Sequence, residues 1–269
     1  MTISNWNDAI TQYLTHLSAG GQPDTTLATR KWHLVLAARF LNVDPWAVTG
    51  VELVEWFASR VWAQETRRSA RSTMRGFYQW SVDSGHTLHS PALALPAVKA
   101  STPHPRPIPD SMYRAALLAA DERVRFMFRL SAEAGLRRAE VAVVNSNDLV
   151  EDLLGWSLLV HGKGRKLRTI PLSNSLAADL MALPTGWVFP GNEEGHLSPR
   201  WVGTLVGRCL PEGWTMHKLR HRFASKAYAV DRDVFTVQDL LGHASPVTTR
   251  AYVVISDDAK RRTIDAIAA

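Results

Sequence analysis

His217 and Arg220, three residues apart, have the types and spacing of side chains that act on an anionic group. The apolar residues around them recur at helical spacing and are Leu219, Phe223, Ala227 and Val230. This pattern predicts a helix that carries both polar side chains on one side, next to an apolar stripe. A guanidinium fork matches two oxygens of a phosphate, and an imidazole can move a proton near neutral pH. The pair therefore predicts one wall of a site for chemistry on a phosphate.

The residues that follow predict a second helix that ends close to this wall. Thr236, with an aspartate three positions later, resembles a capping box, and Gly242 suits the left-handed residue that ends a helix. His243 then comes just past that helix end. The Ser-Pro pair at 245–246 indicates a new helix start, because serine accepts from free amides and proline fits the first helical position. Tyr252 falls on the second turn of that new helix.

The order of these motifs closely resembles the C-terminal signature of the tyrosine recombinases, the family of phage integrases and Xer-type proteins. The shared features are H-x-x-R, then G-H, then a tyrosine nine residues after the second histidine. Residues 134–140 (AGLRRAE) resemble the family's G-L-R-x-x-E segment, and residues 162–166 (GKGRK), followed by Ile-Pro-Leu, resemble its lysine-bearing β-turn. The resemblance covers about 160 residues, and four ordered motifs rarely coincide by chance. By position, the residues carried over are Arg137, Lys163, His217, Arg220, His243 and Tyr252.

The resemblance implies DNA cleavage by a tyrosine without a metal or other cofactor. The two arginines would stabilise charge on the phosphate oxygens, as metal ions do in other enzymes. Tyr252 would attack the phosphate, with His217 as the base, while His243 would donate to a phosphate oxygen. Lys163 would protonate the departing 5′ oxygen. The product would be a 3′-phosphotyrosyl bond that a second strand can reverse without ATP.

Each motif also has an ordinary structural explanation. His217 and His221 form H-x-x-x-H, but this lacks the glutamate of zinc proteases, and the arginine beside them disfavours a cation. Lys163 could lie in a plain hairpin turn, since the G-x-x-x-x-G-K-[ST] pattern of a phosphate-binding loop is absent. Arg137 could pair with the glutamate three residues later, and Tyr252 could be a half-buried core residue. The order and spacing of the motifs favour the recombinase site.

The composition indicates a globular chain that binds an acidic partner. The 269 residues are 46% hydrophobic, which allows one or two domains, and the formal net charge is +6. Nucleic acid is the commonest partner of such a chain. Cys209 is the only cysteine, which excludes an intrachain disulfide and favours a reducing compartment. No apolar run approaches about 20 residues and the first residues lack a signal pattern, so we expect an intracellular protein without a membrane partner. The family resemblance implies the cytoplasm of a bacterial host.

Residues 1–90 predict a module of four or five short helices. One begins near Asp24, and the last long one, residues 65–82, carries Arg67, Arg68, Arg71 and Arg75. Arg68, Arg71 and Arg75 recur at three- and four-residue spacing and could form a ridge that meets phosphates or enters a groove, although a solvated helix face fits the pattern as well. All four arginines are candidate DNA contacts. The resemblance favours DNA, because family members carry a helical core-binding domain in this half.

Six prolines between residues 91 and 109 predict an extended linker, with a surface loop of a single domain as the alternative. The resemblance implies that residues 110–269 form the catalytic domain. Helices are expected over 110–130, continuing through 131–144 with Arg137, and again over 173–183 and 199–210, while alternation in 148–171 predicts a small antiparallel sheet. The expected fold class is mainly α with this sheet, in two domains: a helical core-binding domain and an α+β catalytic domain.

We therefore expect a site-specific recombinase that integrates and excises phage or mobile-element DNA. The alternatives are Xer-like resolution of chromosome or plasmid dimers and a DNA-binding relative without catalysis. The resemblance implies double-stranded DNA attachment sites as partners, a homotetramer on DNA, a monomer in free solution, and a directionality factor. The tail after Tyr252 predicts a short helix with Ile264 and Ile267 on one side, which docks either on the adjacent subunit or on its own domain.

Overall fold

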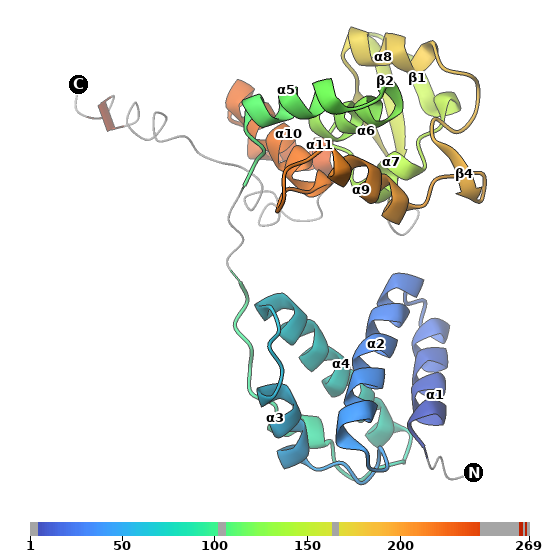
Figure 1. Cartoon of the computed structure of the whole chain (residues 1–269), viewed down its shortest axis with the longest axis vertical. Coiled ribbons are helices and arrows are strands. Elements are labelled where there is room, and N and C mark those ends of the chain that lie inside the picture. Colours follow the sequence, from blue (N-terminus) through green and yellow to red (C-terminus); the bar gives the residue numbers. More distant parts are fainter. Residues whose placement is uncertain (1–4, 102–105, 163–166, 243–263, 266, 268–269) are drawn as a thin grey trace. The chain divides into compact units, whose positions relative to one another are not determined.

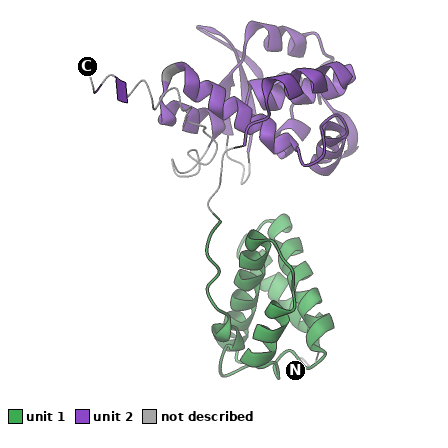
Figure 2. Ribbon diagram, turned by 60° about the vertical axis from the view of Figure 1, so that its left-hand side comes forward, with its two compact units in different colours: residues 1–102 green, residues 103–269 purple. Residues whose placement is uncertain are grey.

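Short polar side chains begin several helices of this computed structural model, and residues in the left-handed conformation end some of them. Asn5, Thr49, Asp121 and Ser173 each accept a backbone N–H of the first helical turn, and Gly242 has φ of 60°. The structure describes residues 5–101, 106–162, 167–242, 264, 265 and 267. The chain divides into unit 1, residues 1–102, and unit 2, residues 103–269 (Figure 2). Within the described ranges, no helix is both long and apolar enough to cross a membrane.

The described part of unit 1 is a helical bundle (Figure 1). Its core is rich in aromatic side chains. Its elements are α1 (Trp6–Ala19), α2 (Asp24–Leu41), α3 (Gly50–Ala58), α4 (Gln64–Asp83) and a 3-10 turn, η1 (Pro91–Ala94). The Phe77 ring of α4 stacks on the indoles of Trp6 and Trp46, with a distance of 5.7 Å between ring centroids in each pair. Such stacking adds to the burial of large apolar surface. Unit 1 thus has a hydrophobic core of its own, and α4 is buried along one side.

The proline-rich stretch differs at both ends from the predicted extended linker. At its start Pro91 takes the first position of η1, where a helix needs no N–H donor, and Ala92 and Leu95 are buried in the core of unit 1. At its end Ile108 is 2% exposed and belongs to the core of unit 2. The part of this stretch that packs into neither core is therefore shorter than 91–109.

Unit 2 combines helices with a small sheet (Figure 1). The helices are α5 (Asp110–Ala119), α6 (Glu122–Glu133), α7 (Arg138–Ala142), the 3-10 turn η2 (Ser146–Asp148), α8 (Asn174–Met181), α9 (Pro199–Arg208), α10 (Met216–Asp231) and α11 (Val234–Leu241). The strands are β1 (Leu149–Asp152), β2 (Gly155–His161), β3 (Leu167–Pro171) and β4 (Pro190–Glu193). Strands β1, β2 and β3 form an antiparallel sheet in that order. The predicted fold class, mainly α with a small antiparallel sheet, is confirmed.

The alternation of the sheet strands positions one face against the core. Leu158 of β2 lies opposite Leu149 of β1 and opposite Ile170 of β3. Leu158, Val160 and Ile170 are buried, and successive residues of a strand point to opposite faces. Arg168 of β3 pairs with Val160 in the register. The sheet therefore positions Arg168 near α7 and α11, where the candidate site lies.

Candidate active site

Helix α10 presents His217 and Arg220 from its first turns. Thr215 precedes the helix with extended backbone angles, and the helix runs from Met216 to Asp231. Met216 and Leu219 are buried in the main core of unit 2, which anchors the start of the helix. The predicted helix is confirmed. Side chains three residues apart lie on the same side of a helix, so the imidazole and the guanidinium are neighbours.

The guanidinium of Arg220 is held between the turn that follows α6 and the C-terminal end of α11. It is 1% exposed, and it donates to the carbonyl oxygen of Gly135 and, at 2.5 Å, to that of Leu241. Gly135 lies in the turn between α6 and α7, and Leu241 is the last residue of α11. Burial lowers the local dielectric and strengthens a charge there. Arg220 thus ties three separate segments into one cationic site.

Arg137 lies in a turn, so the predicted continuous helix over 131–144 is wrong. Helix α6 ends at Glu133, and Gly135 adopts φ of +68°. A Cβ on Gly135 would come within 2.5 Å of the Phe223 ring, so both the backbone angle and the packing require glycine there. The chain restarts with Arg137 as the N-cap of α7. The turn thereby leaves the Arg137 side chain 38% exposed beside the buried Arg220.

Glu140 is the carboxylate that holds the basic side chains together. Its side chain is 3% exposed and accepts from the Arg137 backbone N–H and from the Arg137 guanidinium, both at 2.7 Å. Arg168 donates to both carboxylate oxygens at 2.8 Å, and Arg220 lies 3.8 Å away. Burial alone raises the pKa of Glu140, but the hydrogen bonds from Arg168 and from the Arg137 N–H outweigh it and lower this pKa to about 2. Glu140 is therefore ionised at neutral pH and orients the arginines.

The sequence analysis missed Arg168. The residue belongs to none of the motifs, and only the pairing of β3 with the rest of the sheet brings it to α7 and α11, where it also donates to the Leu240 carbonyl at 3.3 Å. A signal was present in the chain: Arg168 comes five residues after Lys163 and alternates with Ile170, which must face the core.

His217 and His221 are edge to face, with ring centroids 4.8 Å apart and planes at 85°. Partial burial, then the charges of Arg220, Lys218 and Arg137, lower the pKa of His217. Burial, then the charge of His217, lowers the pKa of His221 to about 4. Both imidazoles are therefore mainly neutral at pH 7, so His217 has a lone pair with which to accept a proton. Among the described residues, no three His, Cys, Asp or Glu side chains gather as a metal site would require.

Helix α11 brings its C-terminal end to the two arginines. Its N-cap is Asp233, which accepts from Phe235 N–H at 2.8 Å and Thr236 N–H at 3.1 Å, so the predicted cap at Thr236 is wrong by three residues. The predicted left-handed end at Gly242 is confirmed. A Cβ on Gly242 would meet the Arg168 side chain at 2.8 Å, and the Gly242 carbonyl accepts from Arg137 at 3.4 Å. Glycine is thus required where the chain passes closest to the arginines.

Three predicted site residues lie outside the described residues: Lys163, His243 and Tyr252. Lys163 falls in sequence between β2 and β3, and His243 directly follows Gly242. Of the six predicted catalytic residues, the structure brings Arg137, His217 and Arg220 together around the end of α11. The roles of all six remain predictions.

We expect Glu140→Gln to destabilise unit 2 by about 3–5 kcal/mol, because a buried ion pair that loses one partner leaves uncompensated charge. The folded-state pKa of Glu140 is lowered, so its contribution is complete above the ordinary glutamate pKa and is lost as the pH falls towards about 2. Urea denaturation should therefore show a large difference from the unmodified chain at pH 7 that shrinks below about pH 4.5. The matched control is Glu133→Gln, a 32% exposed partner of Arg129, which should cost no more than about 1 kcal/mol. Equal effects of the two variants would contradict the central role of Glu140.

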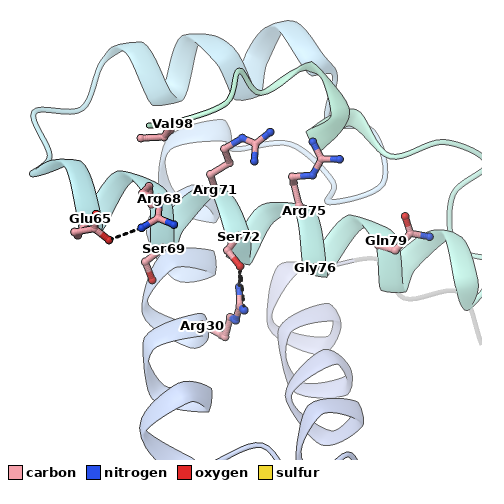
Figure 3. Close-up of a pocket in the computed structure, with 10 residues that line it drawn as sticks. All are labelled: Arg30, Glu65, Arg68, Ser69, Arg71, Ser72, Arg75, Gly76, Gln79 and Val98. Carbon is pink, nitrogen blue, oxygen red and sulfur yellow. Dashed lines mark hydrogen bonds and ion pairs between the residues drawn. The ribbon is translucent and has the colours of Figure 1, made fainter. Parts of the chain in front are cut away.

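Unit 1 holds a separate basic groove of about 780 Å³ along α4 (Figure 3). The side chains in Figure 3 come from α4, from α2 and from the segment after η1. The lining residues that carry charge or hydrogen-bonding groups are Arg30, Glu65, Arg68, Ser69, Arg71, Ser72, Arg75 and Gln79. Arg30 donates to the Ser72 hydroxyl at 3.3 Å, and Arg71 to the Leu95 carbonyl at 3.2 Å. The groove therefore gathers four guanidinium groups on one face.

Arg67 does not line this groove, in contrast to the other three arginines predicted to contact DNA. Its guanidinium donates to the carbonyls of Phe57 at 2.7 Å and Arg60 at 2.6 Å, at the end of α3. One residue of offset on a helix turns a side chain by about 100°. The sequence analysis counted Arg67 among the DNA contacts although it lies outside the ridge of Arg68, Arg71 and Arg75. It missed Arg30, which only the packing of α2 against α4 brings to the groove.

The chain matches the model of the phage integrase family over residues 110–258. It is 36% identical over 228 residues to the tyrosine recombinase XerC of Rhodospirillum centenum, a match that spans 73% of this chain and 65% of that relative. It is 30% identical over 234 residues to XerC of Azotobacter vinelandii, which spans 78% of each. The fold is similar to that of a lambda integrase dimer bound to a COC′ core site, with a TM-score of 0.74, 19% identity, and 91% of this chain and 76% of that one covered.

Proposed function

Because the chain belongs to the phage integrase family of tyrosine recombinases, a class of enzymes that cleave and rejoin DNA, we propose that it catalyses site-specific recombination through a covalent 3′-phosphotyrosyl intermediate. The observation that carries the proposal is that Arg137 and Arg220 meet at the end of α11, with His217 close enough to both for their charges to lower its pKa. The two guanidinium groups come from segments 83 residues apart in the chain, and the carboxylate of Glu140 orients them. This arrangement supports a site for a phosphodiester.

The guanidinium groups of Arg137 and Arg220 suit the transition state of phosphoryl transfer. A phosphodiester repels nucleophiles, and attack places more charge on its oxygens, so preorganised cations lower the barrier. Arg220 is fixed by two carbonyls and Arg137 by Glu140, so neither must reorganise during the reaction. An arginine does not lose its charge at any working pH. The pair can therefore supply the charge that metal ions supply in other phosphoryl transferases.

We assign the remaining steps to residues that the motifs predict. Tyr252 is the nucleophile, and neutral His217 accepts the hydroxyl proton as the tyrosyl oxygen bonds to phosphorus. The P–O bond to the 5′ oxygen breaks, and Lys163 gives that oxygen a proton. His243 donates to a phosphate oxygen. The phosphotyrosyl bond retains the energy of the phosphodiester, so a 5′ hydroxyl of another strand can reverse the sequence and complete the exchange.

The biological role has two candidates. The motifs alone suggest integration and excision of phage or mobile-element DNA, whereas the two relatives described above are both XerC proteins, which favours Xer-type resolution of chromosome or plasmid dimers. We propose the Xer-type role as the better supported of the two, in the cytoplasm of a bacterial host and as a multimer on paired DNA sites. Plasmids that carry either a repeated chromosomal site or a pair of attachment sites distinguish the roles: resolution of the first without integration of the second supports the Xer-type role.

The basic groove of unit 1 is proposed to bind the DNA backbone. Guanidinium groups are common partners of phosphate oxygens, and the groove presents four of them. Arg75 makes no hydrogen bond or ion pair within the described residues of unit 1, so its charge is available to a phosphate. Arg71 and Arg30 are held by Leu95 and Ser72, which preorganises them.

We expect Arg75→Ala to weaken DNA binding at every sequence and to lower the slope of log K against log salt by about 1, because one phosphate contact is lost. Arg67→Ala is the matched control on the same helix. Its guanidinium supports the end of α3, so we expect a lower thermal midpoint and an unchanged salt slope. Fluorescence titration at several salt concentrations measures both. A changed slope for Arg67→Ala with an unchanged one for Arg75→Ala would refute this assignment of the groove.

A further inference from the structure

The chain enters unit 2 along one side of α10, the helix that carries His217 and Arg220. We call residues 106–110 the strap. The Arg106 guanidinium lies 5.1 Å from the centroid of the Trp214 ring, two residues before α10 begins. The Ile108 N–H donates to the Lys218 carbonyl at 3.3 Å, and the Ile108 side chain is 2% exposed. The strap is thus attached near the start of the helix by a cation–π contact, a hydrogen bond and a buried side chain.

Asp110 completes the attachment one and two turns further along α10. One carboxylate oxygen accepts from Arg222 Nε at 3.0 Å, and the other lies 3.0 Å from Lys226 Nζ. The hydrogen bond from Lys226 is the largest cause of the lowered pKa of Asp110, so the carboxylate is charged at neutral pH. The guanidinium of Arg222 also packs 4.1 Å from the centroid of the Tyr113 ring of α5. Asp110 therefore binds two successive turns of α10 at once.

The contacts follow one line along α10. The residues that the strap touches are spaced by four: Trp214, Lys218, Arg222 and Lys226. Residues four apart stack on one ridge of a helix, whereas His217 and Arg220 are turned away from that ridge by an angle on the order of 100° to 160°. The strap therefore holds the side of α10 that faces away from the candidate site.

We propose that the strap holds α10 in the position that DNA cleavage requires, with Asp110 as the positioning residue. This rests on the proposed function of the site. Arg220 must reach the carbonyls of Gly135 and Leu241 from α10, so a slide or rotation of the helix moves its guanidinium away from both. A displacement of about 1 Å at a reacting centre can lower a rate about a hundredfold. The strap begins four residues after Thr102, the last residue of unit 1.

A simpler role for Asp110 is to stabilise the start of α5, because a carboxylate in the first helical turn interacts favourably with the helix dipole. The two roles predict different effects from the α10 side of the contact. Removal of Arg222 leaves the Asp110 charge at the start of α5 but removes one of its two bonds to α10, the one from Arg222. If Asp110 acts through α10, then Arg222→Ala and Asp110→Ala impair cleavage similarly, and the double variant is no worse than either one.

The experiment measures single-turnover cleavage of a nicked DNA site by the full chain, at saturating protein, together with the DNA dissociation constant and the thermal midpoint. For Asp110→Ala we expect cleavage to fall by about tenfold or more, with the dissociation constant within about twofold of the unmodified value. Asp110→Glu, which keeps a carboxylate at this position, should restore most of the rate. Asp179→Ala is the matched control: Asp179 is 50% exposed and pairs with Arg129 on α6, as Asp110 is 49% exposed and pairs with Arg222. It should cleave at the unmodified rate.

Three outcomes overturn the inference. One is an equal loss of cleavage in Asp179→Ala. Another is a loss confined to DNA affinity, with unchanged cleavage at saturation. The third is additive losses in the variant that lacks both Asp110 and Arg222, which would mean that the two residues act separately. Failure of the proposed function is distinguishable from these, because the unmodified chain would then form no covalent product on any DNA.

Discussion

Arg220→Ala is expected to lower the DNA cleavage rate by about 10²- to 10³-fold, or about 3–4 kcal/mol, as the loss of one oxyanion donor does in other enzymes. The side chain is buried and bound to the carbonyls of Gly135 and Leu241, so its charge acts in a region of low dielectric. Arg220→Lys should recover little of this rate, because an ammonium cannot span the two carbonyls and two phosphate oxygens at once.

The loss must be separated from unfolding. Two buried carbonyls without their donor cost about 1–3 kcal/mol each, so Arg220→Ala should also be less stable in urea. Cleavage is therefore measured by single turnover at a temperature where each variant is folded. The control is Arg123→Ala, which removes a guanidinium that donates to the Pro190 carbonyl at 2.7 Å elsewhere in unit 2. A loss of tenfold or less for Arg220→Ala, with a folded protein, would contradict its proposed role.

Tyr252→Phe is expected to bind target DNA with unchanged affinity and to form no covalent adduct. The phenyl ring retains the bulk of the side chain but has no oxygen that can bond to phosphorus. The assignment comes from sequence spacing, because Tyr252 follows Gly242 by ten residues and the carbonyl of that glycine lies 3.4 Å from Arg137. The proposed nucleophile thus follows, in the sequence, a residue whose carbonyl contacts the candidate site.

Tyr228→Phe is the matched control for this variant. Tyr228 lies on α10 and packs, partly buried, against the small cluster of Ala224, Val237 and Leu241. The Tyr228→Phe substitution removes one hydroxyl from the same unit and leaves the proposed nucleophile unchanged. We expect it to form the adduct at close to the unmodified rate. Loss of the adduct in both variants would indicate a general effect of tyrosine substitution and would refute the specific role of Tyr252.

The parts of the site that the sequence predicted are those that depend on local periodicity. The helix with His217 and Arg220 follows from its apolar stripe, and the end of α11 follows from Gly242, since both signals lie within a few residues of the feature they set. Local signals also misled. The apolar pattern around Gly135 suggested one helix, yet the left-handed glycine packed against Phe223 breaks it and exposes Arg137.

The parts that could not be predicted depend on contacts between distant segments. Arg168 reaches Glu140 only through the register of β3, and Arg30 reaches Ser72 only because α2 packs on α4. The alternation of Arg168 with Ile170 indicates the face of the sheet that Arg168 takes, but no spacing within the chain identifies Glu140 as the partner of Arg168 or Ser72 as the partner of Arg30. The position of Arg67 away from the proposed DNA surface also depends on a contact between separate segments, because its guanidinium binds carbonyls at the end of α3.

The measurement that tests the central claim most directly is the chemical identity of the covalent protein–DNA adduct. The full chain is incubated with nicked duplexes that carry candidate sites, so that cleavage releases a short strand and traps the adduct, which is then digested and mapped by mass spectrometry. We expect a single DNA-linked peptide that contains Tyr252, joined through its phenolic oxygen to a 3′ phosphate, with a free 5′ hydroxyl on the released strand. An adduct at another residue, a 5′ linkage, or cleavage without any adduct would contradict the account.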